Sequence, residues 1–143
     1  MEAVVENRVS GIVVIVLTVL TGMVLSVVPV PHSVPAELGF VRPDWVAMVL
    51  VYWILALPHR LGLISAWCIG IVMDILLGSL IGQHALSYVA IAYIVANLYQ
   101  RLRMFSVWQQ AAVLFAILGV NHLINFWVES IFGLNEWSMW YLL

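Results

Sequence analysis

The sequence contains no lysine, and arginine supplies all five of its basic residues. Charged residues make up only 8% of the chain, against about a quarter in an ordinary soluble domain. So few positive charges exclude a nucleic-acid-binding surface and a polybasic lipid-binding patch. They also exclude the class of soluble globular proteins, because such a chain cannot cover its surface with charged groups.

Cysteine and metal-ligand patterns are equally scarce. Cys68 is alone, which excludes an internal disulfide, and we interpret it as a small buried packing residue. His32, His59 and His84 all fall in expected loops without the spacing of a metal site, so we expect no metal and no cofactor. No nucleophile elbow or phosphate-binding loop occurs. A membrane enzyme would have only His32, Glu37 and His84 as external candidates, and these are dispersed.

Hydrophobic residues dominate what is present. They make up 65% of the chain, and the mean hydropathy is +1.12. We therefore predict an all-α, polytopic integral membrane bundle that forms one transmembrane domain over residues 1–143, with five full spans and the start of a sixth. The spans are expected at about 9–28, 43–58, 61–81, 84–99, 105–132 and, incomplete, 137–143. We interpret the first as a retained anchor, and we expect the natural chain to continue beyond the last.

The arginines predict the orientation of these spans. If every apolar segment crosses the membrane, Arg8, Arg60, Arg101 and Arg103 fall on one side and only Arg42 falls on the other. Loops that face the cytoplasm carry the excess of positive charge. The N-terminus is therefore expected in the cytoplasm.

A row of small residues marks the third expected span. Its members follow one another at a spacing of four: Gly62, Ala66, Gly70, Asp74, Gly78 and Gly82. Small residues allow membrane helices to approach closely. Because six such positions sweep more than half of a helix circumference, we expect neighbours on at least two sides and the other spans arranged around this one.

Two other stretches suggest contacts. Thr18, Gly22 and Ser26 form a second small-residue face on the first span, which could pack against the third span or receive a partner helix. The sequence Arg42-Pro43-Asp44-Trp45 begins the second span, where we expect Asp44 to cap the helix, Pro43 to fix its approach and Trp45 to lie at the headgroup level.

One carboxylate is expected inside the membrane. Burying Asp74 at mid-helix costs about 2.5–3.5 kcal/mol on insertion scales, so it needs a partner. On the fifth span Asn121, Asn125 and Glu129 lie four apart with His122 beside them. We predict a polar cluster in which Asp74 faces Asn121, His122 and Asn125, while Glu129 is hydrated. Hydrogen bonding that fixes helix packing is favoured over a proton or ligand site.

These residues carry a family resemblance. The stretches RPDW from Arg42, YWILALPHR from Tyr52, GIVMDILLGS from Gly70 and WQQ from Trp108 closely resemble rod shape-determining protein MreD of Gram-negative bacteria. The resemblance implies a six-helix inner-membrane protein of the cell-elongation machinery. It implies partners too: MreC directly, and MreB, RodZ, RodA and a class B penicillin-binding protein in lateral-wall peptidoglycan synthesis. The family also looks distantly like the substrate-binding membrane subunits of vitamin uptake transporters.

The function we expect is therefore that of a non-enzymatic membrane scaffold that binds the transmembrane helix of MreC among the surrounding lipids. Lipid-facing parts of the first span, including Thr18, Gly22 and Ser26, are the expected contact. The alternative is a small-molecule or lipid-binding component in which Asp74, His122 and Asn125 line a cavity open to the outside.

Overall fold

The structure is a computed structural model that describes residues 2–28 and 43–133, with side chains from residue 8 onward. These residues form helices and turns without any strand, which confirms the all-α prediction. The five helices are α1 (Glu2–Val27), α3 (Trp45–Ala56), α4 (Leu63–Leu77), α5 (Gln83–Leu102) and α6 (Val107–Ile131). The expected sixth span at 137–143 lies outside the described residues.

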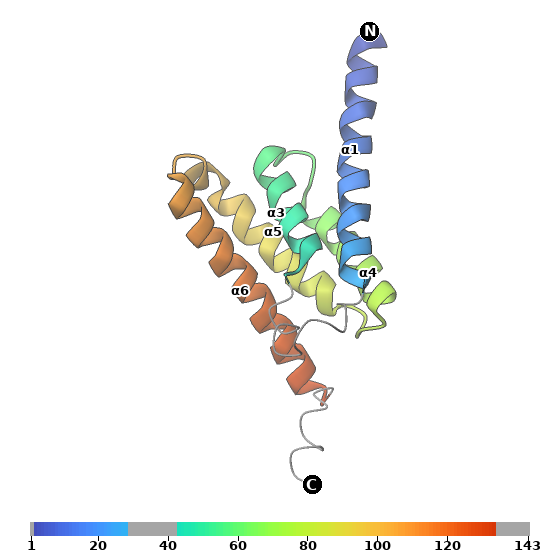
Figure 1. The fold of residues 1–143 in the computed structure, drawn as a ribbon, viewed down its shortest axis with the longest axis vertical. Coiled ribbons are helices and arrows are strands. Elements are labelled where there is room, and N and C mark those ends of the chain that lie inside the picture. The colour runs from blue at the N-terminus through green and yellow to red at the C-terminus, as the bar shows by residue number, and fades with distance from the viewer. Residues whose placement is uncertain (1, 29–42, 134–143) are drawn as a thin grey trace.

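Helix α5 lies at the centre of the arrangement (Figure 1). It packs against α3, α4 and α6, whereas α1 packs mainly on the outer side of α3. Tyr88, Ile91 and Val95 of α5 are fully buried against Leu50 and Ile54 of α3 in one hydrophobic core. The expectation that the other helices surround the third span is therefore wrong, because α4 packs extensively only with α5.

The prediction that the row from Gly62 to Gly82 forms one packing surface is confirmed for its middle positions and wrong for its ends. Ala66, Gly70 and Asp74 are buried on α4, and a Cβ at Gly70 would lie 2.8 Å from the carbonyl carbon of His84 and closer still to Ala85. Gly62 instead precedes α4 as its N-cap, and α4 ends at Gly78 with a φ of 65°. Gly82 precedes α5 with a φ of 104°. At Gly78 and Gly82 glycine adopts these left-handed conformations without steric cost, so these two residues form the turn between α4 and α5 instead of a helix-packing surface.

The small-residue face of α1, formed by Thr18, Gly22 and Ser26, packs against another helix of the same chain. The indole Nε1 of Trp53 on α3 donates to the Thr18 hydroxyl at 2.8 Å. A Cβ at Gly22 would lie 3.6 Å from the backbone of Trp45, so α1 and α3 cross closely there. Ser26 is half-buried on the same helix. The main neighbour of this face is α3 rather than α4, and its centre is not free to receive a partner helix.

Within residues 2–28 and 43–133, two helices are long and apolar enough to cross a membrane, at Arg8–Val27 and Val107–Ile131. Helices α3 and α4 are apolar but have only 12 and 15 residues, because the turns at Pro58–Gly62 and Gly78–Gly82 shorten them. Five full spans and a cytoplasmic N-terminus therefore stay predictions.

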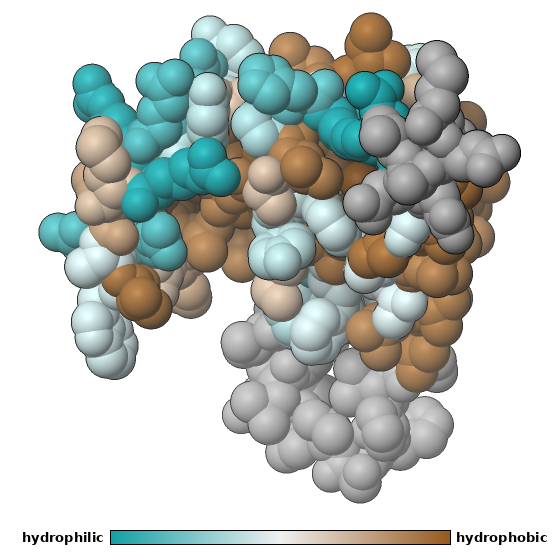
Figure 2. Space-filling model, turned by 90° about the horizontal axis from the view of Figure 1, so that it is seen from above, coloured by the Kyte–Doolittle hydropathy of each residue, from teal (hydrophilic) through white to brown (hydrophobic). Residues whose placement is uncertain are grey.

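Charge is divided between the two ends of the bundle. The start of α1, the α3–α4 turn and the α5–α6 turn lie at the same end (Figure 1), so Arg8, Arg60, Arg101 and Arg103 share it. Seen from above, hydrophilic residues gather over this end and hydrophobic surface lies beside them (Figure 2). We call it the arginine end. Cys68 is exposed on α4, not buried as interpreted.

Close packing at Gly70 generates the first prediction. The Gly70→Ala substitution forces a methyl group into the backbone of α5 and should destabilise the protein by about 1–3 kcal/mol or more. The control is Gly119→Ala, because a Cβ at Gly119 meets nothing within 4 Å and alanine favours a helix by about 1 kcal/mol. Thermal unfolding in detergent measures both. Equal melting temperatures for the two variants would contradict the close approach.

Candidate functional site

Asp74 is fully buried one turn before the end of α4, and its carboxylate closes the turn that follows. Its Oδ1 accepts hydrogen bonds from the Ser79 hydroxyl and the His84 amide, both at 2.9 Å. Its Oδ2 accepts from the Gly82 amide at 2.7 Å. The Nδ1 atom of His84 lies 2.8 Å from the same carboxylate. Asp74 thus ties the end of α4 to the start of α5.

These bonds correct the predicted polar cluster. Asp74 does not hydrogen-bond to Asn121, His122 or Asn125, because the turn from Ser79 to His84 supplies its donors. The expected span placed Asp74 at mid-helix, whereas α4 ends three residues later at Leu77. On α6, Asn121 is fully buried, Asn125 is half-buried and His122 is exposed, so the three do not form one site.

Asp44, which is half-buried, is a second hub, a residue that joins several helices through hydrogen bonds. As predicted, it is the N-cap of α3, where its Oδ1 accepts from the Ala47 amide at 3.0 Å. The Tyr88 hydroxyl of α5 lies 3.0 and 3.1 Å from its two oxygens, and Asn121 Nδ2 of α6 donates to Oδ2 at 2.8 Å. One carboxylate therefore joins α3, α5 and α6.

Sequence reasoning found the cap but missed this hub. Asp44 and Asn121 are separated by 77 positions, and no local spacing pairs them. A buried tyrosine on α5 was the available signal, since a buried hydroxyl needs an acceptor. Of the neighbouring residues singled out with Asp44, Trp45 begins α3 and is half-buried, Pro43 is exposed, and Arg42 lies outside the described residues.

A third bond links α5 to α6 at the same end. Gln83 is buried, and its Nε2 donates to Glu129 Oε1 at 2.9 Å. Glu129 is half-buried in this bond, which corrects the expectation that it is simply hydrated. The acidic side chains that the structure describes all lie at the end of the bundle opposite the arginine end; they are Asp44, Asp74 and Glu129. We call this the carboxylate end.

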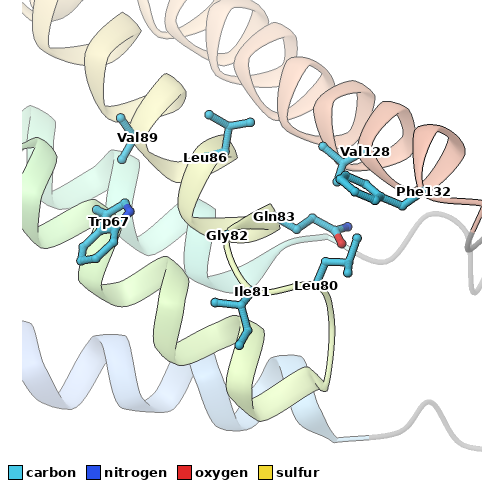
Figure 3. Close-up of a pocket in the computed structure, with 9 residues that line it drawn as sticks. All are labelled: Trp67, Leu80, Ile81, Gly82, Gln83, Leu86, Val89, Val128 and Phe132. Atoms are coloured by element: carbon cyan, nitrogen blue, oxygen red, sulfur yellow. The ribbon is translucent and has the colours of Figure 1, made fainter.

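A groove of about 560 Å³ opens beside the carboxylate end (Figure 3). Its walls are Trp67 of α4, Ile81 in the turn, Leu86 of α5 and Phe132 after α6, with Gln83 as a polar group between them. A second groove of about 690 Å³ lies between α3 and α6. Asp74, His122 and Asn125, which the alternative function needs around one cavity, line neither of these two grooves.

Ser79, His84 and Asp74 are the residue types of a hydrolase triad, but their geometry differs. A triad places the serine and the carboxylate on opposite imidazole nitrogens. Here Ser79 Oγ and Asp74 Oδ1 both approach Nδ1 of His84, at 3.3 and 2.8 Å, and the hydroxyl donates to the carboxylate. The arrangement fixes a turn and does not activate a nucleophile.

The other two residues considered as enzyme candidates cannot be placed relative to His84. His32 and Glu37 lie outside the described residues. In the part of the chain that the structure describes, no group of three or more His, Cys, Asp or Glu side chains is placed to hold a metal ion.

Comparison with known proteins gives one family. Residues 7–143 match the family of rod shape-determining protein MreD. The rod shape-determining protein MreD of Haemophilus influenzae is 32% identical over 112 residues, which cover 78% of this chain and 69% of that protein. No solved structure matches the chain.

The Asp74 hub generates the second prediction. The Asp74→Asn substitution keeps the side-chain size but turns an amide NH2 group toward donors of the 79–84 turn. Leaving a buried donor unsatisfied costs about 1–3 kcal/mol, so the melting temperature should fall. Glu129→Gln, which retains an acceptor for Gln83, is the control and should change the stability by less than about 1 kcal/mol. A wild-type melting temperature for Asp74→Asn would contradict the hub.

Proposed function

This chain belongs to the family of rod shape-determining protein MreD, and from this premise we propose that it acts in bacterial cell shape as a non-enzymatic scaffold of the inner membrane. It crosses the membrane several times with a cytoplasmic N-terminus. It binds the transmembrane helix of MreC, and through it works with MreB, RodZ, RodA and a class B penicillin-binding protein in lateral-wall peptidoglycan synthesis.

The use of the buried polar groups is the observation that carries the scaffold proposal. The fully buried Asp74 and the half-buried Asp44 both accept hydrogen bonds from groups of the chain itself. Such bonds select one helix arrangement in lipid, where an unsatisfied polar group is costly. They leave a rigid body whose outer surface is apolar, which suits binding to other membrane segments.

The distribution of exposed apolar residues supports several membrane crossings. Several large apolar side chains are mostly exposed. On α1, Leu17 is 56% exposed and Val24 is 62% exposed. On α4, Ile64 is 80% and Ile75 is 67% exposed, and on α6 Phe126 is 58% exposed. A soluble protein rarely exposes so large an apolar surface, whereas lipid covers it without cost. Four arginines at one end favour that end as the cytoplasmic one.

The contact that we propose for MreC is on α6 and not on the face of α1 that the sequence predicted. Thr18 and Gly22 already pack on α3. Ala112, Ala116 and Gly119 are exposed along one side of α6, which packs mainly against α5 on its other side. Their spacings of four and three place them on a common face, and their small side chains would let a partner helix approach closely.

Site-specific photocrosslinking in living cells tests this contact. A photoreactive residue at Ala116 should capture MreC, since a partner helix packed on the small residues of α6 would lie within reach. The same residue at Ile64, which is 80% exposed on α4, is the matched control and should capture lipid or nothing. Capture at Ile64 but not at Ala116 would contradict the assigned face. No capture of MreC at any exposed position of the five helices would overturn the scaffold proposal.

A further inference from the structure

The second groove lies between α3 and α6, with the end of α5 as its floor. Its volume of about 690 Å³ is within the range of about 300–1,000 Å³ that small-molecule sites occupy. Val51 and Leu55 of α3 form one wall, and Leu114 and Leu118 of α6 form the other. Leu102 of α5 closes it. The body of the groove is therefore apolar.

Its polar groups sit where α5 passes into α6, at the arginine end. Gln110 Nε2 donates to the Leu102 carbonyl at 2.7 Å, which holds the first turn of α6 against the last turn of α5. Arg103 lines the groove beside it and is exposed. Among the described residues the one ion pair is His84 with Asp74, so Arg103 has no carboxylate partner there. The positive charge of Arg103 therefore lies unpaired at one end of this apolar groove.

The short α3 helix places this charge near the lipid headgroups. Its 12 residues extend about 18 Å, whereas the hydrocarbon layer is about 30 Å thick. A wall this short cannot span the apolar layer, and the bilayer adapts to short segments by local thinning. The headgroup of a neighbouring lipid can therefore reach Arg103 while its acyl chain lies along α3.

We propose that this groove binds one acyl chain of an anionic phospholipid, whose phosphate contacts Arg103. The groove and the lipid match in charge and shape. The lipid carries a negative group at the end of a long apolar chain, and the groove has an apolar lining with the positive charge of Arg103 at one end. A partner helix fits less well, because large side chains such as Leu55 and Phe115 dominate the lining and close helix packing needs small ones. Basic pockets between helices on the cytoplasmic side suit anionic headgroups. The proposal does not depend on MreC binding.

Native mass spectrometry of the purified full chain tests the headgroup contact. Phosphatidylglycerol and phosphatidylcholine with identical acyl chains are titrated separately, and phosphatidylglycerol should bind more tightly. Arg103→Gln should weaken phosphatidylglycerol binding about fivefold, as expected for one arginine near an anionic group. Arg103→Lys should keep the preference. The matched control is Arg60→Gln, which removes one charge from the same end without touching the groove and should stay within about twofold of wild type.

A second pair of variants tests the groove itself. Ala111→Phe fills it from α6, whereas Ala112→Phe adds the same ring at the adjacent position, which does not line it. Only Ala111→Phe should reduce binding, and gel filtration and melting temperature confirm that each variant folds. The proposal is overturned if phosphatidylcholine binds as tightly as phosphatidylglycerol, if Arg103→Gln behaves like Arg60→Gln, or if both phenylalanine variants bind like wild type. No MreC is present, so the outcome is independent of the scaffold proposal.

Discussion

A carboxylate packed among apolar helices needs hydrogen-bond donors from the chain itself, and two carboxylates, the fully buried Asp74 and the half-buried Asp44, tie the helices of this bundle together. Asp74 binds Ser79, Gly82 and His84, and so fixes the turn that folds α5 back on α4. Asp44 joins the start of α3 to Tyr88 of α5 and, on α6, to Asn121. Removing either carboxylate would leave buried donors unpaired, which costs more than the bonds themselves contribute.

The close approach of α4 and α5 depends on the same end of the bundle. Gly70 lets the backbone of Ala85 come within contact, and Asp74 lies one turn further along α4, where it receives the amides of the turn. Small residues and a buried acceptor thus act together: the first allows the approach and the second fixes its register. Outside these hydrogen-bonded groups, many large apolar side chains of the described helices are exposed.

Local patterns in the sequence predicted the local parts of this structure. Hydropathy located all five described helices, the sequence around Asp44 predicted an N-cap, and the spacing of Ala66, Gly70 and Asp74 predicted a buried packing row. The errors arose where one residue type has two uses. Gly78 continues the spacing of that row, but its left-handed conformation ends the helix instead, and the sequence pattern does not separate the two roles.

Contacts between distant segments could not be predicted in the same way. Extending the third span to residue 81 placed Asp74 at mid-helix and suggested partners on α6, whereas its hydrogen-bond partners follow within ten residues of the chain. Asn121 was correctly singled out as polar and buried, but it bonds to Asp44, which had been assigned only to a helix cap. The face of Thr18 was identified, yet only the structure shows that Trp53 of α3 covers it.

The claim that buried polar groups fix the helix arrangement is tested most directly by a double-mutant cycle between Asp44 and Asn121. The two residues lie on segments 77 positions apart, so any coupling must come from their contact in the folded bundle. Asp44→Ala, Asn121→Ala and the double variant are compared by reversible unfolding in mixed micelles. The structure predicts a coupling free energy of about 0.5–3 kcal/mol. Effects that add within about 0.3–0.5 kcal/mol would contradict the central role of this network.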